Sequence, residues 1–165
     1  MARAPTNELL GSNDAVIVLG PGPVETHVKL ARAPLQKVAA SYTPDAMAPD
    51  KPGEPDRMFL KLHNIRGNQG ACIFDVAISV RGSAGSGIPV GSVTLFGLEH
   101  ASKKTSRHGG SGLTKTIEIT EAADQYLPEL TKAGDVTVTI TPRGILRPDD
   151  KITVDQISLY RLSGQ

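Results

Sequence analysis

The sequence predicts an all-β protein, an antiparallel β-sandwich with about seven or eight strands. Short segments alternate apolar with polar residues at a period of two, which is the pattern of half-buried strands. The 17 glycines and 12 prolines divide the chain into such segments. The strands do not alternate regularly with helices, as they would in a parallel sheet, so we expect antiparallel connections.

Composition limits both the core and the partners of this chain. Its 165 residues suit one domain, and with 39% hydrophobic but only 4% aromatic residues the interior must consist of Val, Ile, Leu and Ala. The 18 basic and 17 acidic residues nearly cancel, which excludes general affinity for nucleic acid or an anionic membrane. Cys72 is the only cysteine, so neither an intramolecular disulfide nor a thiolate cluster can form. Residues 1–20 lack an apolar run long enough for a signal peptide or a membrane span, and we expect a cytoplasmic chain.

The chain is expected to have three parts. Residues 1–40 hold two candidate strands, 15–19 and 26–30, on either side of a Gly-Pro turn. Residues 41–56 contain four prolines and four acidic side chains, a composition typical of an extended, solvated linker. Residues 57–165 are expected to form the β-sandwich domain.

Most strands of the sandwich can be placed by alternation. Residues 72–80 give the clearest case, with Cys72, Phe74, Val76, Ile78 and Val80 on one face. Further strands are predicted at 58–65, at 92–98 with Val93 and Leu95 on one side, at 113–119, and around Val136, Val138 and Ile140.

Two segments depart from alternation. Residues 121–130 fit one short helix, with Thr120 as its N-cap and Pro128 distorting or ending it. In the last strand, Ile152 and Val154 fall on one parity, whereas Ile157 and Leu159 fall on the other. A bulge near Asp155 or Gln156 would bring all four to one buried face.

No pattern in the sequence predicts catalysis, a cofactor or a metal site. The four histidines, at 27, 63, 100 and 108, lack the spacing that places imidazoles together on a strand or helix face. His100 and His108 are the weak candidates, because they flank a loop that could bring them together. That loop also carries Lys103, Lys104 and Arg107, which form either a solvated connection or an interaction loop for an acidic partner.

Several segments together resemble the C-terminal extension that follows the di-copper core of tyrosinases and polyphenol oxidases. NELLGSND and VIVLGPGPVETHVKL are similar to the stretch that leaves the core of bacterial tyrosinases. The likeness continues through RMFLKLHNIRGNQGACIFDVAISV, GSVTLFGLEHAS, HGGSGLTKTIEIT, VTVTITPRG and ITVDQISLYR. Phe74, Asp75 and Val76 match the FDV of a motif typical of the plant enzymes.

The resemblance implies a jelly-roll sandwich that packs over the entrance of the copper pocket and keeps the oxidase latent or aids its maturation. Its partner would be a tyrosinase-like core in the same or a separate chain. The family's two copper ions are held by six histidines on a helical bundle, which this chain lacks. We therefore expect a domain that is not an enzyme by itself and that holds no cofactor.

Two other functions remain open from the sequence. One is a free-standing or self-assembling sandwich that binds a surface or a carbohydrate through its loops, since one fold hosts many functions. A row of exposed aromatic residues would favour sugar binding. The other is a small metalloenzyme that uses His100 and His108.

Overall fold

The computed structural model describes residues 4–42, 55–68, 72–80, 87–103, 110–144, 146–147 and 149–163. These residues form nine strands and four helices. The strands are β1 (Asn7–Ser12), β2 (Ile17–Leu19), β3 (Val24–Leu30), β4 (Arg57–Gly67), β5 (Ile73–Ser79), β6 (Ile88–Thr94), β7 (Leu113–Glu118), β8 (Asp135–Pro142) and β9 (Ile152–Leu162). The helices are α1 (Arg32–Ser41), α2 (Leu98–Ser102), α3 (Thr120–Gln125) and α4 (Leu127–Ala133).

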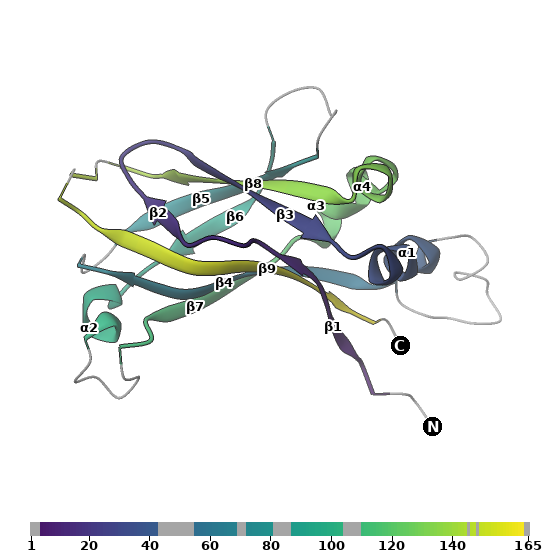
Figure 1. Ribbon diagram of the computed structural model, residues 1–165, viewed down its shortest axis with the longest axis horizontal. Coiled ribbons are helices and arrows are strands. Elements are labelled where there is room, and N and C mark those ends of the chain that lie inside the picture. The colour runs from purple at the N-terminus through teal and green to yellow at the C-terminus, as the bar shows by residue number, and fades with distance from the viewer. Residues whose placement is uncertain are drawn as a thin grey trace.

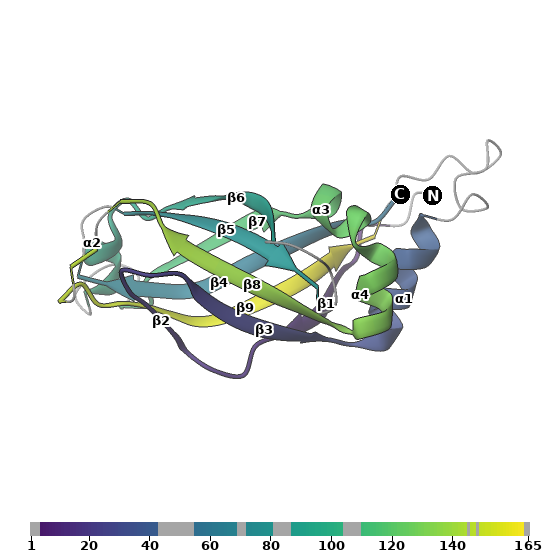
Figure 2. The same cartoon turned by 90° about the horizontal axis from the view of Figure 1, so that it is seen from above.

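All nine strands belong to one antiparallel sheet. Their order is β6-β5-β8-β3-β1-β9-β4-β7, and β2 pairs with β9. The sheet curls until its end strands, β6 and β7, lie side by side (Figure 1 and Figure 2). The apolar side chains of its inner face pack against one another across the two layers. The predicted all-β antiparallel sandwich is thus confirmed, with nine strands in the described residues.

The strands with regular alternation form the core as expected. In β5 and just after it, Phe74, Val76, Ile78 and Val80 are buried, while Cys72 is half-buried. Val93 and Leu95 share one buried side. In β8 the buried residues are Val136, Val138 and Ile140. Such residues contribute about 1.5–3 kcal/mol each when fully buried, which explains why the alternation is so regular here.

Both long strands, β4 and β9, switch the face that points into the core partway along their length. They do so at positions that are paired with each other. In β9, all four predicted residues, Ile152, Val154, Ile157 and Leu159, are buried. The predicted bulge near Asp155 or Gln156 is wrong, because β9 keeps the same register with β4 before and after the switch of buried face. The extra residue lies instead in β4, where its register with β7 shifts between Leu62 and Ile65 and where Asn64 has a φ of 50°.

The helical segments differ from prediction. Residues 120–133 form two helices, α3 and α4, rather than one, and Pro128 lies in the first turn of α4, where its missing N–H is tolerated. Thr120 is the first helical residue and not the N-cap; its hydroxyl accepts a hydrogen bond from the Met58 N–H at 3.0 Å. Helix α1, which the sequence analysis did not predict, packs beside α4 (Figure 2).

Strands from residues before the proline-rich segment lie in the middle of the sheet. β3 pairs with β8 and β1 pairs with β9, so the first part of the chain shares one core with the last part. The ends of the proline-rich segment are held together. The Tyr42 hydroxyl donates to the Asp56 carbonyl at 2.9 Å, and the Asp56 N–H donates to Ser41 Oγ at 3.1 Å.

A group of charged side chains closes this end of the core, and we call it the Arg161 cluster: Arg161, Asp56, Glu8 and Lys37. Arg161 forms ion pairs with Asp56 and, at 2.7 Å, with Glu8. The Arg161 and Asp56 side chains are only 13% and 6% exposed. Lys37 reaches Glu8 from α1 at 3.1 Å. These pairs join β1, β9, α1 and the residue before β4.

No helix of the described residues combines the length and apolar character needed to cross a membrane.

Candidate interaction surface

Phe96 is the most exposed large apolar residue in the described part of the chain, with 81% of its surface accessible. It follows β6 and precedes Gly97, whose φ of 74° turns the backbone into α2. Its neighbours Leu95 and Leu98 are both buried, so the backbone on each side of the ring is anchored in the core. Because the backbone on both sides is already fixed, binding through this residue does not have to order the chain around it, which lowers the entropic cost of an interface anchor.

The end of the sandwich that carries Phe96 is remote from the chain ends. Helix α2 lies at one end of the long axis, and β1 begins and β9 ends at the other (Figure 1). Nζ of Lys103, the residue after α2, lies 3.6 Å from Oε1 of Glu99, and His100 within α2 is exposed. Lys104, Arg107 and His108 lie outside the described residues. Of the predicted interaction loop, the described residues 100–103 lie in and just after α2, which begins two residues after Phe96. The candidate pair of His100 and His108 stays a prediction.

The FDV residues have a structural role in the described geometry. Phe74 and Val76 point into the core. Asp75 points outward and accepts hydrogen bonds from Arg143 and, at 2.6 Å, from the Ser92 hydroxyl. Arg143 is the main cause that lowers the pKa of the Asp75 carboxyl. The three residues thus pack β5 and tie β6 to the turn after β8.

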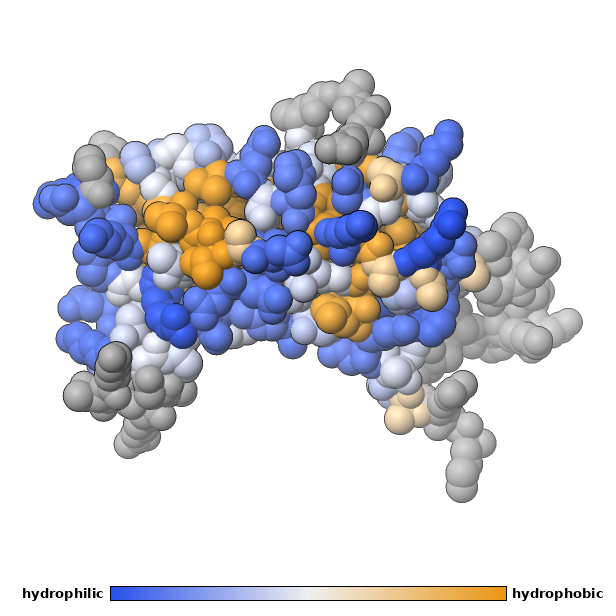
Figure 3. All heavy atoms as spheres, viewed as in Figure 1, coloured by the Kyte–Doolittle hydropathy of each residue, from blue (hydrophilic) through white to orange (hydrophobic). Residues whose placement is uncertain are grey.

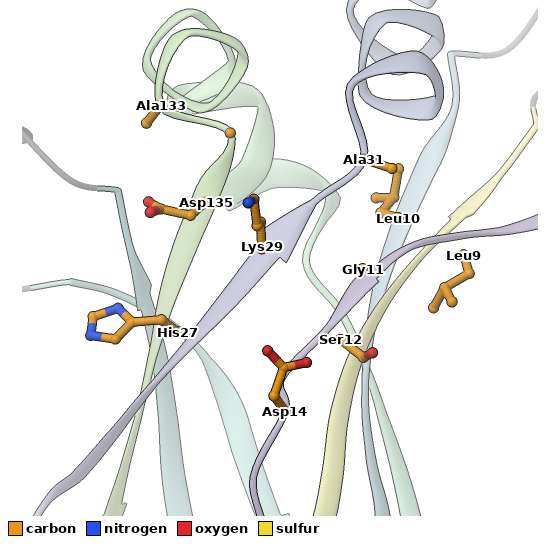
Figure 4. Close-up of a pocket in the computed structure, with 11 residues that line it drawn as sticks. Leu9, Leu10, Gly11, Ser12, Asp14, His27, Lys29, Ala31, Ala133 and Asp135 are labelled. Carbon is orange, nitrogen blue, oxygen red and sulfur yellow. The ribbon is translucent and has the colours of Figure 1, made fainter.

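A groove of about 680 Å³ lies between β1, β3 and the start of β8 (Figure 4). Its lining includes the charged residues Asp14, Lys29 and Asp135 and the imidazole of His27. Figure 4 shows these side chains spread around the groove without meeting at one point. No cluster of three or more His, Cys, Asp or Glu side chains that could hold a metal occurs among the described residues.

A Ser–His contact that the sequence did not reveal lies where β4 and β9 change face. His63 Nε2 is 3.1 Å from Ser158 Oγ. Such a pair can act as a base and a nucleophile, but Ser158 is only 1% exposed, so a substrate cannot reach its hydroxyl. Burial, with the charge of Lys61 as a smaller cause, lowers the pKa of His63.

This lowered pKa predicts a pH dependence of stability. The folded state favours neutral His63. The stability that the neutral side chain contributes is therefore fully present above the unfolded pKa of about 6.5 and is lost as the pH falls through the folded pKa. We expect His63→Gln to remove part of the loss of unfolding free energy between pH 7 and pH 5 in urea titrations. His27→Gln, at an exposed ring bonded to Thr137, is the matched control. Equal slopes in wild type and His63→Gln would contradict the assignment.

The aromatic side chains do not form an exposed row. Phe59 and Tyr160 lie opposite each other on β4 and β9. The Arg57 guanidinium lies 5.1 Å from the Phe59 ring centroid, and Lys61 Nζ lies 5.1 Å from that of Tyr160. Each of these two rings therefore has a cation of the same chain over it.

Three other large apolar residues are exposed in the described part of the chain. Leu9, Val16 and Val18 are exposed on or next to β1 and β2. Figure 3 shows the hydrophobic areas of this face as separate patches broken by hydrophilic side chains. The fold and this surface define an antiparallel β-sandwich domain whose notable exposed feature is an anchored apolar side chain rather than a ligand-holding cluster.

The chain belongs to the family described as "Domain of unknown function (DUF7868)", which matches residues 6–162. It is also 28% identical over 111 residues to tyrosinase HcTyr1 of Hahella sp. (strain CCB-MM4), across 66% of this chain and 24% of that protein. The chain thus spans about a quarter of the length of this curated relative.

Solved structures of plant oxidases share the fold. Latent apple tyrosinase MdPPO1 superposes with a TM-score of 0.53 at 19% identity, over 90% of this chain and 27% of that one. A latent aurone synthase, a polyphenol oxidase from a natural source, gives a TM-score of 0.51 at 15% identity, over 89% and 26%. The predicted relationship to the C-terminal domain of tyrosinases and polyphenol oxidases is confirmed.

Proposed function

We propose that this chain is a non-catalytic covering domain of a tyrosinase-like copper oxidase. It packs over the active-site entrance of a di-copper core, in the same or a separate chain, and keeps that core latent or assists its maturation. The relationship to tyrosinase supports this, as does the fact that the chain matches 24% of the tyrosinase relative's length. Two solved relatives are described as latent enzymes.

The observation that carries the proposal is Phe96. A covering domain needs a side chain that can enter a concave apolar surface on its partner, and Phe96 is exposed at the tip of a turn that is fixed on both sides. In this proposal the core supplies the copper and the chemistry, while this chain supplies a rigid sandwich and the contact.

The test mixes the full chain with a copper-loaded tyrosinase core that lacks its own extension. We expect a lower rate of diphenol oxidation and co-elution of the two proteins in size-exclusion chromatography. An unchanged rate without co-elution would contradict the proposal.

A variant locates the contact. Truncation of an anchor costs about 2 kcal/mol or more, so Phe96→Ala is expected to weaken binding to the core about 30-fold or more. Val18→Ala removes apolar surface from a residue that is 63% exposed on β2 and should leave the affinity within about twofold. If Phe96→Ala binds as tightly as Val18→Ala does, Phe96 is not the contact.

A further inference from the structure

Residues 4–42, the N-terminal segment, complete the sheet formed by residues 55–163, the C-terminal body. The segment's β3 pairs along β8 from Val24↔Ile140 to Lys29↔Asp135. Its β1 pairs along β9 from Asn7↔Leu162 to Ser12↔Ser158. In the sheet order β3 and β1 separate β8 from β9. The segment thus fills a slot between two strands of the body, as a donated strand does in β-strand addition.

The seam between the two parts contains many buried apolar side chains. The segment contributes seven buried side chains to the common core: Leu10, Ile17, Leu19, Val28, Leu30, Leu35 and Val38. A contact that shares a core in this way resembles an obligate subunit interface. Association of this kind does not require a covalent link between the parts.

Polar contacts fix the register of the seam. The Asn13 N–H donates to the Ile157 carbonyl at 3.0 Å, and the Ile157 N–H donates to Asn13 Oδ1 at 2.7 Å. The Leu30 N–H donates to the Gly134 carbonyl at 2.8 Å. At the opposite end of β1, Glu8 pairs with Arg161.

The covalent connection adds comparatively little to this hold. The residues that flank it, Ser41 and Tyr42 on one side and Asp56 on the other, are already joined by hydrogen bonds. The free energy of closing a chain connection grows only slowly with its length. The covalent link therefore acts mainly by raising the local concentration of the two parts.

We propose that the N-terminal segment and the C-terminal body stay assembled when the chain is cut between residues 43 and 54. The consequence for regulation rests on the proposed function. Such a cut does not release the covering domain from polypeptide that precedes residue 4, because the N-terminal segment remains held in the sheet. Release requires opening of the sheet or a cut ahead of β1.

The test replaces residues 46–51 of the full chain with the recognition sequence of a site-specific protease. After complete cleavage, verified on a denaturing gel, we expect both fragments to elute together with a mass near the 17.4 kDa of the whole chain. The far-ultraviolet circular dichroism should be unchanged. Separation of the fragments, or precipitation of the larger one, would overturn the proposal.

Two matched variants test the seam itself. Val28→Ala removes apolar surface from the segment side of the seam and is expected to weaken fragment association about 10-fold or more. Val93→Ala makes the same change inside the body, on β6, and should leave association nearly unchanged. Equal effects would overturn the assignment of the seam. This fragment assay contains no oxidase core. Separation of the fragments would therefore overturn the seam proposal without deciding whether the intact domain binds a core, which the mixing experiment measures separately.

Discussion

Replacing Arg161 by methionine is expected to lower the free energy of unfolding by about 3–5 kcal/mol. Methionine keeps much of the side-chain volume but removes the guanidinium that pairs with the carboxylate of Asp56, whose side chain is 6% exposed. Glu8 loses the same partner. Urea unfolding at neutral pH, followed by circular dichroism, measures the difference.

Lys37→Met is the matched control for this prediction. Lys37 also pairs with Glu8, but its side chain is 55% exposed, and exposed pairs contribute only about 0–1 kcal/mol. If Arg161→Met costs no more than Lys37→Met, the Arg161 cluster does not hold the end of the core in the way described.

Gly11→Ala is expected to destabilise the protein by about 3 kcal/mol or more, at the upper end of the range for overpacking. A β-carbon at this position would lie 2.0 Å from the Lys29 carbonyl oxygen, where β1 and β3 approach each other. Because the obstacle is backbone, one of the two central strands must move. Thermal and urea unfolding of the variant measure the effect.

Gly20→Ala provides the comparison for Gly11→Ala. A β-carbon at Gly20 meets no atom within 4 Å, so this variant should unfold within about 0.5 kcal/mol of wild type or be slightly more stable. A Gly11→Ala variant as stable as Gly20→Ala would mean that β1 and β3 are not held so closely together.

The sequence predicts the parts of the fold that depend on regular alternation, because burial alone decides those residues. This applies to β5, to β8 and to the switch of buried face in β9, where the four apolar residues were expected to point into one core and are all buried. The sequence analysis did not predict β1, in which the charged Glu8 turns toward the end of the core. Its partner Arg161 is 153 residues away, a separation that no local pattern reveals.

Helix α1 was missed for a related reason. Pro34 looks like a helix breaker, but it lies in the first turn, where proline is tolerated. The helix is then fixed by Leu35 and Val38, which pack into a core formed largely by distant strands. Tertiary packing, rather than local propensity, decides this segment.

The exposed position of Phe96 could not be predicted from the sequence either. Phe96 falls within residues 92–98, which alternation predicts as one strand, so the ring looked like an ordinary residue on the second face. The strand ends at Thr94 instead, and Gly97 turns the chain. The glycine directly after an aromatic residue was the available signal, but glycine alone does not distinguish a turn from a bulge.

The pairing of the first strand with the last has a consequence for the order of events during synthesis. β1 can pair with β9 only when residues up to Leu162 have left the ribosome, and β3 must wait for β8. Domains generally fold as units as they emerge, and sheets with such distant pairings form slowly. In the arrangement that we propose, with this domain after an oxidase core in one chain, the core has time to fold and to bind its metal before the domain forms over it.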